Sequence, residues 1–450
     1  MRTRATAAML VATGLAGSLA IAGAATVGAT GDDVPIATGE MPVYGDFGGA
    51  VVTMNGPERS EEEAGALIAI VGAFAEANNI DFTYTGDADW ESNINVQVEG
   101  GSPPNIAMFP QPGKLAEFAR EGALKPLSDN VVESVNIFWN EGASGYGNVD
   151  GVQFGVPIKS DLKSIVWYQP AQFAAAGYEV PETWDEFTAL VDQMAADGER
   201  KPLCVGIESG TATGWPFTDW VEEMVLRQSG PEVYDQWVTN EIPFDDERIV
   251  TAMQTVADLW TEDNVYASGG SIAATAFQIN GADLVDGQCW MHRQANFFAS
   301  FIPEGTPFAD GSENAVDVFY FPDINGDRPV LGAGTFAAAF TDDEATMAVM
   351  QFFSTNEYAT GRQRAQAELK GGGVSGFVSA ARGQDPSVYL PLEQSFLEIL
   401  NTAEIFRFDG SDLMPADVGA GTFWSESVKI VTGEVTPAEA AANIQASWPS

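Results

Sequence analysis

The chain has 450 residues, more than one hydrophobic core usually serves, so two packed units are expected. Hydrophobic residues make up 45% of the sequence, which allows substantial cores and excludes a disordered protein. The 64 acidic and 20 basic residues give a net charge of −44, which excludes nucleic acid and anionic lipid as partners, disfavours acidic substrates and is typical of a solvated surface in salty surroundings.

The first 30 residues have the layout of a secretory signal peptide. Arg2 and Arg4 precede an apolar run rich in alanine and glycine, with small-residue cleavage options after Ala24 or Ala29. An uncleaved membrane anchor is the alternative interpretation of this run. No cysteine lies near its end, which argues against a lipid anchor, and no later stretch has the length and apolarity to span a bilayer. We therefore expect an exported protein, in the periplasm or at the outer face of the cell membrane.

Helices and strands are predicted to alternate along the rest of the chain. Helical spacing of apolar residues occurs at 61–78, 181–198, 341–355 and 436–448. The last three of these open with the capping pairs Thr183 and Glu186, Thr341 and Glu344, and Thr436 and Glu439. Short apolar strands are predicted at 50–56, 80–86, 105–110, 164–168, 203–207, 289–292, 318–322 and 335–340. This alternation predicts an α/β protein with mostly parallel sheets.

The two cysteines, Cys204 and Cys289, both lie in strand-like apolar runs. In an exported protein such a pair is expected to be oxidised to a disulfide. Two buried free thiols are the alternative.

The motifs of common enzymes are missing from the chain. With His292 as its single histidine, the sequence has no HExxH or Cys/His cluster for zinc, no GxSxG elbow and no phosphate-binding GxxxxGK[ST]. The "GAGTFA" stretch at 332–337 matches GxGxxA but lacks the acidic partner and the βαβ setting of a dinucleotide site, so a tight turn at a strand end is favoured. No metal and no cofactor are therefore expected. Paired carboxylates of a glycoside hydrolase stay possible, although nothing singles out two of the 64 acids.

The segment "VDGVQFGVPIKSDLKSIVWYQPAQFAAAGYEVPETWDEF" at 149–187 resembles the family-1 extracellular solute-binding proteins of sugar ABC importers. The likeness continues in "GGSPPNIAMFPQPGKLAEFAREGALKPL" at 100–127 and in "FDGSDLMPADVGAGTFW" near the C-terminus, and it covers most of 41–449. Within the family it is greatest to the α-glucoside-binding type. Gln169 stands where the family usually has asparagine, and Asn105 where it usually has aspartate.

This resemblance implies a two-lobed α/β fold like that of periplasmic binding proteins, with a sugar held between the lobes. The implied domains are the signal peptide at 1–30, a first lobe at 41–156 plus 332–372, and a second lobe at 158–325 plus 376–450. The chain should cross between lobes near Pro157, at 322–331 and at 371–373. The implied function is non-catalytic capture of an α-glucoside or related oligosaccharide by a monomer that docks on ABC permease subunits. A secreted glycoside hydrolase acting on α-glucosides is the alternative.

The stretch "GWPFTDW" at 214–220 fits such a sugar site. An aromatic ring stacks on the apolar face of a sugar and polar groups bond its hydroxyls, so Trp215 and Asp219 are candidate ligand contacts. Asp219 could instead cap the helix that starts there, with Glu222 as its partner. Trp220 is expected in the core.

Further candidates follow from positions that match the family's motifs. They are Arg59, Gln111, Asp161, Lys163, Gln294, Phe297, Gly334, Phe336, Asp412 and Trp424. Lys159 and Lys163 are two of only seven lysines, and a solvated pair is the alternative to a role in the site. Trp90 is as compatible with the core as with the site.

Overall fold

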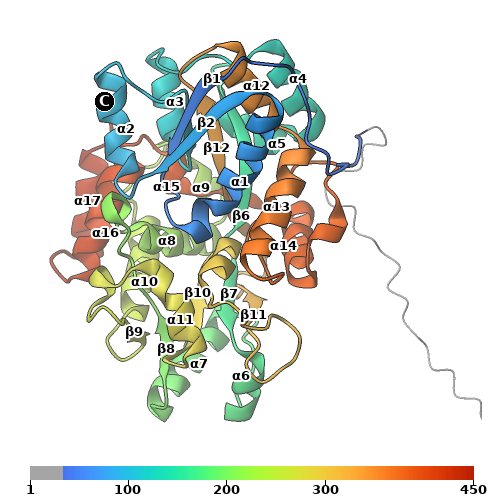
Figure 1. The fold of residues 1–450 in the computed structure, drawn as a ribbon. Helices are drawn as coiled ribbons and strands as arrows, with labels where there is room; N and C mark the ends of the chain where they lie inside the picture. The colour runs from blue at the N-terminus through green and yellow to red at the C-terminus, as the bar shows by residue number, and fades with distance from the viewer. Residues whose placement is uncertain (1–33, 450) are drawn as a thin grey trace, which may run out of the picture.

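The structure, a computed structural model, describes residues 34–449 and holds two lobes, one above the other in Figure 1. The predicted signal peptide at 1–30 lies outside the described residues. Within the described part, none of the helices combines the length and apolarity needed to cross a bilayer.

The first lobe is built on a sheet with the strand order β13-β12-β3-β1-β2, and β6 also pairs with β12. Its strands are β1 (Ala50–Gly56), β2 (Ile80–Gly86), β3 (Ile106–Phe109), β6 (Gly155–Leu162), β12 (Val330–Ala339) and β13 (Phe406–Phe408). Its helices are α1 (Glu61–Ala77), α2 (Trp90–Glu99), α3 (Pro112–Arg120), α4 (Asp129–Phe138), α5 (Glu141–Ser144), α12 (Glu344–Phe353) and α13 (Asn356–Leu369). Just before β6 in the sequence, β4 (Asn148–Val149) and β5 (Val152–Gln153) form a separate two-stranded antiparallel ribbon.

The second lobe is built on a sheet with the order β11-β7-β10-β8-β9. Its strands are β7 (Ile165–Tyr168), β8 (Lys201–Cys204), β9 (Val265–Tyr266), β10 (Cys289–Arg293) and β11 (Asp317–Tyr320). Its helices are α6 (Pro170–Ala176), α7 (Trp184–Asp197), α8 (Trp215–Ser229), α9 (Pro231–Val238), α10 (Glu247–Leu259) and α11 (Asn280–Val285). The last helices of the chain are α14 (Pro391–Thr402), α15 (Gly410–Leu413), α16 (Trp424–Val431) and α17 (Pro437–Ala446), and α16 and α17 pack on α8 and α10.

Both sheets are mixed rather than mostly parallel. β1 runs parallel to β2 and β3, but β12 runs antiparallel to β3 and β6. In the second sheet β7 is antiparallel to both β10 and β11. The antiparallel pairs involve strands next to the crossings between lobes, where the chain leaves one sheet and returns in the opposite direction. The α/β prediction is confirmed, with this change to the strand directions.

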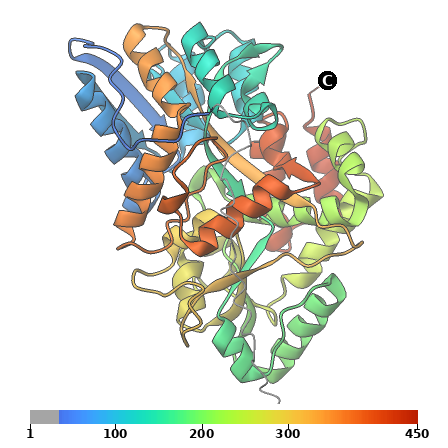
Figure 2. The same ribbon diagram turned by 90° about the vertical axis from the view of Figure 1, so that its right-hand side faces the viewer.

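The chain passes from the first sheet to the second between β6 and β7 and returns between β11 and β12, and after β13 it continues into α16, which packs on α8. Figure 2 shows the long orange strand β12 running toward the waist. The segment 332–337 lies inside β12, so the predicted turn there is wrong; the strand carries a register shift between Thr335 and Phe336. β6 and β13 both belong to the first sheet, whereas the predicted bounds place most of β6 and all of β13 in the second lobe. Crossover strands carry the apolar pattern of either lobe, so sequence alone does not assign them.

Local capping fixes where several helices begin. The predicted capping boxes of Thr183 with Glu186 and of Thr436 with Glu439 are both present. For α12 the predicted cap, Thr341, is wrong: the carboxylate of Asp343 accepts from the Thr346 backbone N–H at 2.9 Å. A carboxylate directly before the first helical residue displaces a threonine two positions earlier.

Each lobe has its own hydrophobic core. In the first lobe Leu67, Val71 and Phe74 of α1 are fully buried against the sheet, and Phe74 stacks on Phe352 with ring centroids 4.4 Å apart. The second core includes Trp220, which is 3% exposed, as predicted. Cys204 and Cys289 form a disulfide between β8 and β10, which confirms the predicted pairing.

Candidate ligand-binding cleft

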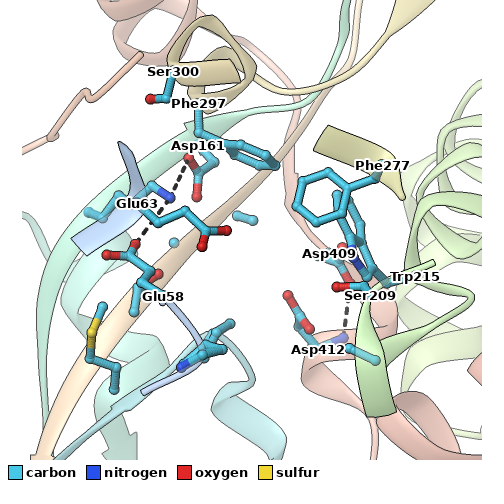
Figure 3. A pocket seen from close by; sticks show the side chains of 18 of the residues that line it. Glu58, Glu63, Asp161, Ser209, Trp215, Phe277, Phe297, Ser300, Asp409 and Asp412 are labelled. Carbon is cyan, nitrogen blue, oxygen red and sulfur yellow. Dashed lines mark hydrogen bonds and ion pairs between the residues drawn. The ribbon is translucent and has the colours of Figure 1, made fainter. Parts of the chain in front are cut away.

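A cleft with a cavity volume of about 190 Å³ lies between the lobes and is lined by residues of both. Several lining residues follow strand ends: Glu58 comes after β1 and Gln111 after β3. In open α/β sheets the carboxyl ends of strands are the usual place for a ligand. Figure 3 shows Glu58, Glu63 and Asp161 on one side of this cleft, and Trp215, Phe277, Asp409 and Asp412 on the other.

Aromatic rings gather at the second-lobe side of the cleft. Trp215 is the first residue of α8, and its ring lies 5.0 Å from Phe277 and 6.2 Å from Phe297 between centroids. Trp215 and Phe297 are both half-buried. The glycine before Trp215 is required, because a Cβ on Gly214 would lie 2.3 Å from the Trp424 carbonyl oxygen. The close contact of α8 with α16 therefore places Trp215 at the cleft.

A buried ionic network lies directly behind these rings. The ammonium group of Lys163 donates to Asp219 at 2.7 Å and also to Asp409. Arg293 donates to Asp219 at 3.1 Å and to Glu223 at 2.8 Å. Lys163, Asp219 and Arg293 are at most 5% exposed. The predicted alternative of a solvated lysine pair is therefore wrong for Lys163.

Burial and charge set the protonation of this network. Burial raises the pKa of Asp219 to about 6, although Lys163 and Arg293 oppose the rise. Burial also opposes the charge of Lys163, but the carboxylates of Asp219 and Asp409 outweigh it and hold the Lys163 pKa well above its usual value. Oxygens of Asp219, Glu222 and Asp409 lie within 4.8 Å of one another, and Lys163 supplies a cation to two of these carboxylates.

Asp219 does not cap its helix. It is the fifth residue of α8, whose N-cap is Gly214, and its carboxylate is held by Lys163 and Arg293 while it lines the cleft. Glu222, proposed as its partner in a capping box, instead accepts from the backbone N–H groups of Gly410 and Ser411 at 2.9 and 3.0 Å. It thereby holds α15 against α8.

The first-lobe side carries a second, more open set of charges. Glu58 pairs with Arg362 at 2.7 Å and with Lys159 at 3.6 Å, and Lys159 also pairs with Asp161 at 3.6 Å. The Lys159 ammonium lies 4.8 Å from the centre of the Phe297 ring. Burial raises the pKa of Asp161. Lys159 and Asp161 are two residues apart in β6, so their side chains share one face of the strand. Lys163 follows directly after the strand, so this short segment supplies charged groups to both sides of the cleft.

Three further predicted residues line the cleft, and each has a side-chain polar group without a hydrogen-bond partner in the described part of the chain. Gln111, at the N-cap of α3, has a buried Oε1 without a hydrogen-bond partner, and the same holds for the indole N–H of Trp424. No described group donates a hydrogen bond to the carboxyl of Asp412, which is 8% exposed. A ligand with hydroxyl groups would satisfy all three.

The structure brings most of the predicted site residues together. The predicted residues that line the cleft are Arg59, Gln111, Asp161, Lys163, Trp215, Asp219, Phe297, Gly334, Asp412 and Trp424. Gln294 does not line it: it is 1% exposed, and its side chain accepts from the Ala295 backbone N–H at 2.8 Å. Phe336 does not line it either, because β12 points this side chain into the first-lobe core, 2% exposed beside Phe408. Trp90 is core as well, 1% exposed, with its N–H donating to Asn55.

Sequence reasoning missed several lining residues. These include Glu58, Glu63, Glu91, Ser209, Phe277, Arg362, Asp409 and Ser411. Asp409 and Ser411 adjoin the predicted Asp412, so the same motif could have indicated them. Arg362 lies in the middle of α13, 2% exposed, and no sequence motif marks it.

Comparison with known proteins agrees with this architecture. Residues 59–360 match the family described as bacterial extracellular solute-binding protein. The chain belongs to this family. The chain is 38% identical over 422 residues to the alpha-glucosides-binding periplasmic protein AglE of Rhizobium meliloti, covering 90% of this chain and 88% of AglE. It is 37% identical to the osmoprotective compounds-binding protein GgtB of Synechocystis, covering 90% of this chain and 94% of GgtB.

Solved structures of solute-binding proteins share the fold. The solute receptor AcbH superposes with a TM-score of 0.73 at 19% identity, covering 89% of this chain and 97% of AcbH. A chitin oligosaccharide binding protein gives a TM-score of 0.73 at 20% identity, with 88% and 98% covered. The two-lobed fold predicted from the resemblance is confirmed.

Membership in the family establishes the function in outline. This solute-binding protein is exported and works with the permease components of an ABC importer. The family consists of binding proteins rather than enzymes, and the comparisons give no support to the alternative of a glycoside hydrolase.

Proposed function

We propose that this solute-binding protein captures an α-glucoside or a related oligosaccharide in the cleft between its lobes. The observation that carries the proposal is the composition of the cleft: the half-buried rings of Trp215 and Phe297 lie beside carboxylates, amides and cations from both lobes. A sugar ring presents an apolar face to such rings and a rim of hydroxyls to such polar groups. The name of AglE, which states α-glucosides, supports the same class of ligand.

The proposed contacts come from both lobes. The rings of Trp215 and Phe297 stack on the sugar. Hydrogen bonds with its hydroxyl groups are made by the side chains of Asp161, Asp219, Gln111 and Asp412. Arg59 and Trp424 make the remaining polar contacts at the edge of the sugar. Gly334 allows β12 to pack closely against β6, since a Cβ on Gly334 would lie 2.7 Å from the Lys159 carbonyl oxygen. Lys163 holds Asp219 in place from behind.

Closure of the lobes about the crossings near 157, 322–331 and 371–373 couples capture to transport. The first lobe comprises 41–156 plus 332–372 and the second 158–325 plus 376–450, apart from the shared crossover strands. A permease pair that binds the closed, liganded monomer better than the open one favours delivery of the sugar. The protein works in the periplasm or at the outer face of the membrane.

A melting experiment with a sugar panel tests this proposal. The mature chain is incubated with maltose, trehalose and sucrose, and each mixture is melted and then analysed for hydrolysis products. A sugar at 100 times its dissociation constant should stabilise the protein by about 2.7 kcal/mol. We expect a clear shift with at least one sugar, no products, and a smaller radius of gyration in X-ray scattering at saturation. Products without a shift, or no shift with any α-glucoside, would contradict the proposal.

A further inference from the structure

The buried charges behind the cleft do not balance. The carboxylates of the cluster are Asp219, Glu222, Glu223, Asp409 and Asp412, and its cations are Lys163, Arg227 and Arg293. Every one of these residues is at most 8% exposed. Five carboxylates against three cations leave two negative charges in excess among side chains that are almost fully buried, and Arg227 is also shared with Asp323. Such a cluster takes up protons, because isolated buried charges are costly.

Hydrogen bonds indicate where a proton is held. Asp219 accepts from Lys163 and Arg293, and Glu223 accepts from Arg227 and Arg293. Glu222 accepts from two backbone N–H groups. Asp409 accepts from Lys163, from the Ser411 hydroxyl at 2.8 Å and from the Asp412 backbone N–H at 2.9 Å. These donors all favour the ionised form of their acceptors.

The Asp412 carboxyl is the exception in having no such donor. Burial also raises the pKa of Glu222 well above its usual value, but the Ser411 backbone hydrogen bond opposes that rise. No group in the described part of the chain donates to the Asp412 carboxyl, and it lies at the surface of the cleft beside Asp409. It is faced by Asp409 on its own turn, by Asp219 of α8, by Glu91 of α2 and by Lys163. Burial raises the pKa of Asp412 well above its usual value, and Asp409 adds to this rise.

Other charged side chains on elements packed against α15 are engaged elsewhere. Lys114 of α3 donates to Asn95 at 2.9 Å, and Glu117 of α3 accepts from the Ala416 backbone N–H at 2.7 Å. Arg407 of β13 pairs with Asp235 of α9. Lys163 is therefore the main cation near Asp412, and its ammonium group already pairs with two other carboxylates, those of Asp219 and Asp409.

We infer that Asp412 meets the ligand as a neutral carboxylic acid and donates its O–H to an oxygen of the sugar, so that sugar binding is linked to a proton. This inference rests on the proposed function. A carboxylate only accepts hydrogen bonds, whereas the acid also donates one, which suits a ring or glycosidic oxygen that carries no hydrogen. A ligand bearing a positive charge would require the opposite, an ionised Asp412.

Affinity for maltose measured between pH 7 and 9, above the pKa of about 6 of the neighbouring Asp219, tests the inference. Above the pKa of Asp412 in the free protein, affinity of the parent should fall by up to about tenfold for each pH unit. Asp412→Asn keeps a donor and cannot ionise, so its affinity should be flat over the same range. Asp417→Asn, an exposed change on the same segment, should keep the parent's slope. A flat parent profile, or an affinity that rises with pH, would overturn the inference.

Melting without sugar separates this inference from the proposed function. A carboxyl with a raised pKa in the folded state loses stability as pH rises from the unfolded value of about 3.9 through the folded value. The melting temperature of Asp412→Asn relative to the parent should therefore increase from pH 4.5 to pH 8. If no sugar binds but this difference grows, the proposed function fails while Asp412 still holds a proton; a constant difference overturns the inference. Asp412→Ser repeats the measurement if the asparagine variant does not fold.

Discussion

The two sides of the cleft hold their charges in different ways. On the first-lobe side Glu58 bridges Lys159 and Arg362, and the side chains of Glu58 and Lys159 keep 14% of their surface exposed. On the second-lobe side Lys163, Asp219 and Arg293 keep 6% or less, and a disulfide joins two strands of the sheet behind them. An ion pair open to water is worth little, whereas a buried one is costly to break. We conclude that the second lobe presents a pre-built surface and the first lobe a more adaptable one.

Two matched lysine variants test this difference between the two sides of the cleft, with the largest expected effect on stability. Lys163→Met leaves Asp219 and Asp409 buried without their shared cation, and should lower the free energy of unfolding by about 3–5 kcal/mol. Lys159→Met, four residues earlier, leaves Glu58 with Arg362 but also removes the cation beside the buried Asp161, so it should cost less than Lys163→Met without being neutral. Denaturant unfolding of both variants at neutral pH measures the difference. Equal losses would show that the two sides are alike.

The disulfide makes a second difference between the lobes. It closes a loop of 85 residues within the second lobe, and in the chain-entropy model such a cross-link stabilises by up to about 4.6 kcal/mol. The double variant Cys204→Ser with Cys289→Ser should therefore unfold at lower denaturant concentration, with the loss confined to the second lobe. Alkylation of the unreduced, denatured parent is the control, and two labelled cysteines there would mean that the bond is absent.

Sequence reasoning found the fold and most of the site because strong local patterns carry both. Capping boxes and apolar periodicity predicted α7 and α17. The composition of "GWPFTDW" predicted Trp215 and Asp219, and a position matching the family's motifs predicted Asp412. Phe336 was wrong because the register of β12 turns its side chain away from the cleft, and residue type does not reveal register. Gln294 was wrong because its side chain bonds the backbone N–H of Ala295 instead of facing the cleft. Arg362 and Glu58 were missed because their pairing joins positions 304 residues apart.

The two tryptophans of the site differ in burial, as the two sides of the cleft do, and Trp215→Ala gives the smallest expected change in stability. Trp215 is half-buried at the cleft face, whereas Trp424 is 3% exposed and its backbone supports α8 at Gly214. Trp215→Ala should weaken sugar binding by about 1.5–3 kcal/mol, a loss of roughly tenfold to a hundredfold or more, with the unliganded melting temperature hardly changed. Trp424→Ala should instead lower stability by about 3–5 kcal/mol as well as binding, because it removes a buried side chain.

Calorimetric titration beside thermal melting separates the two tryptophan roles. Trp215→Phe is the matched control: it keeps an aromatic face over the cleft, so it should retain more affinity than the alanine variant. If Trp215→Ala binds sugar as the parent does but melts far below it, the ring supports the lobe rather than the ligand. The aromatic cluster of Trp215, Phe277 and Phe297 would then be an exposed edge of the second-lobe core, and the sugar would have to lie against the charged first-lobe side.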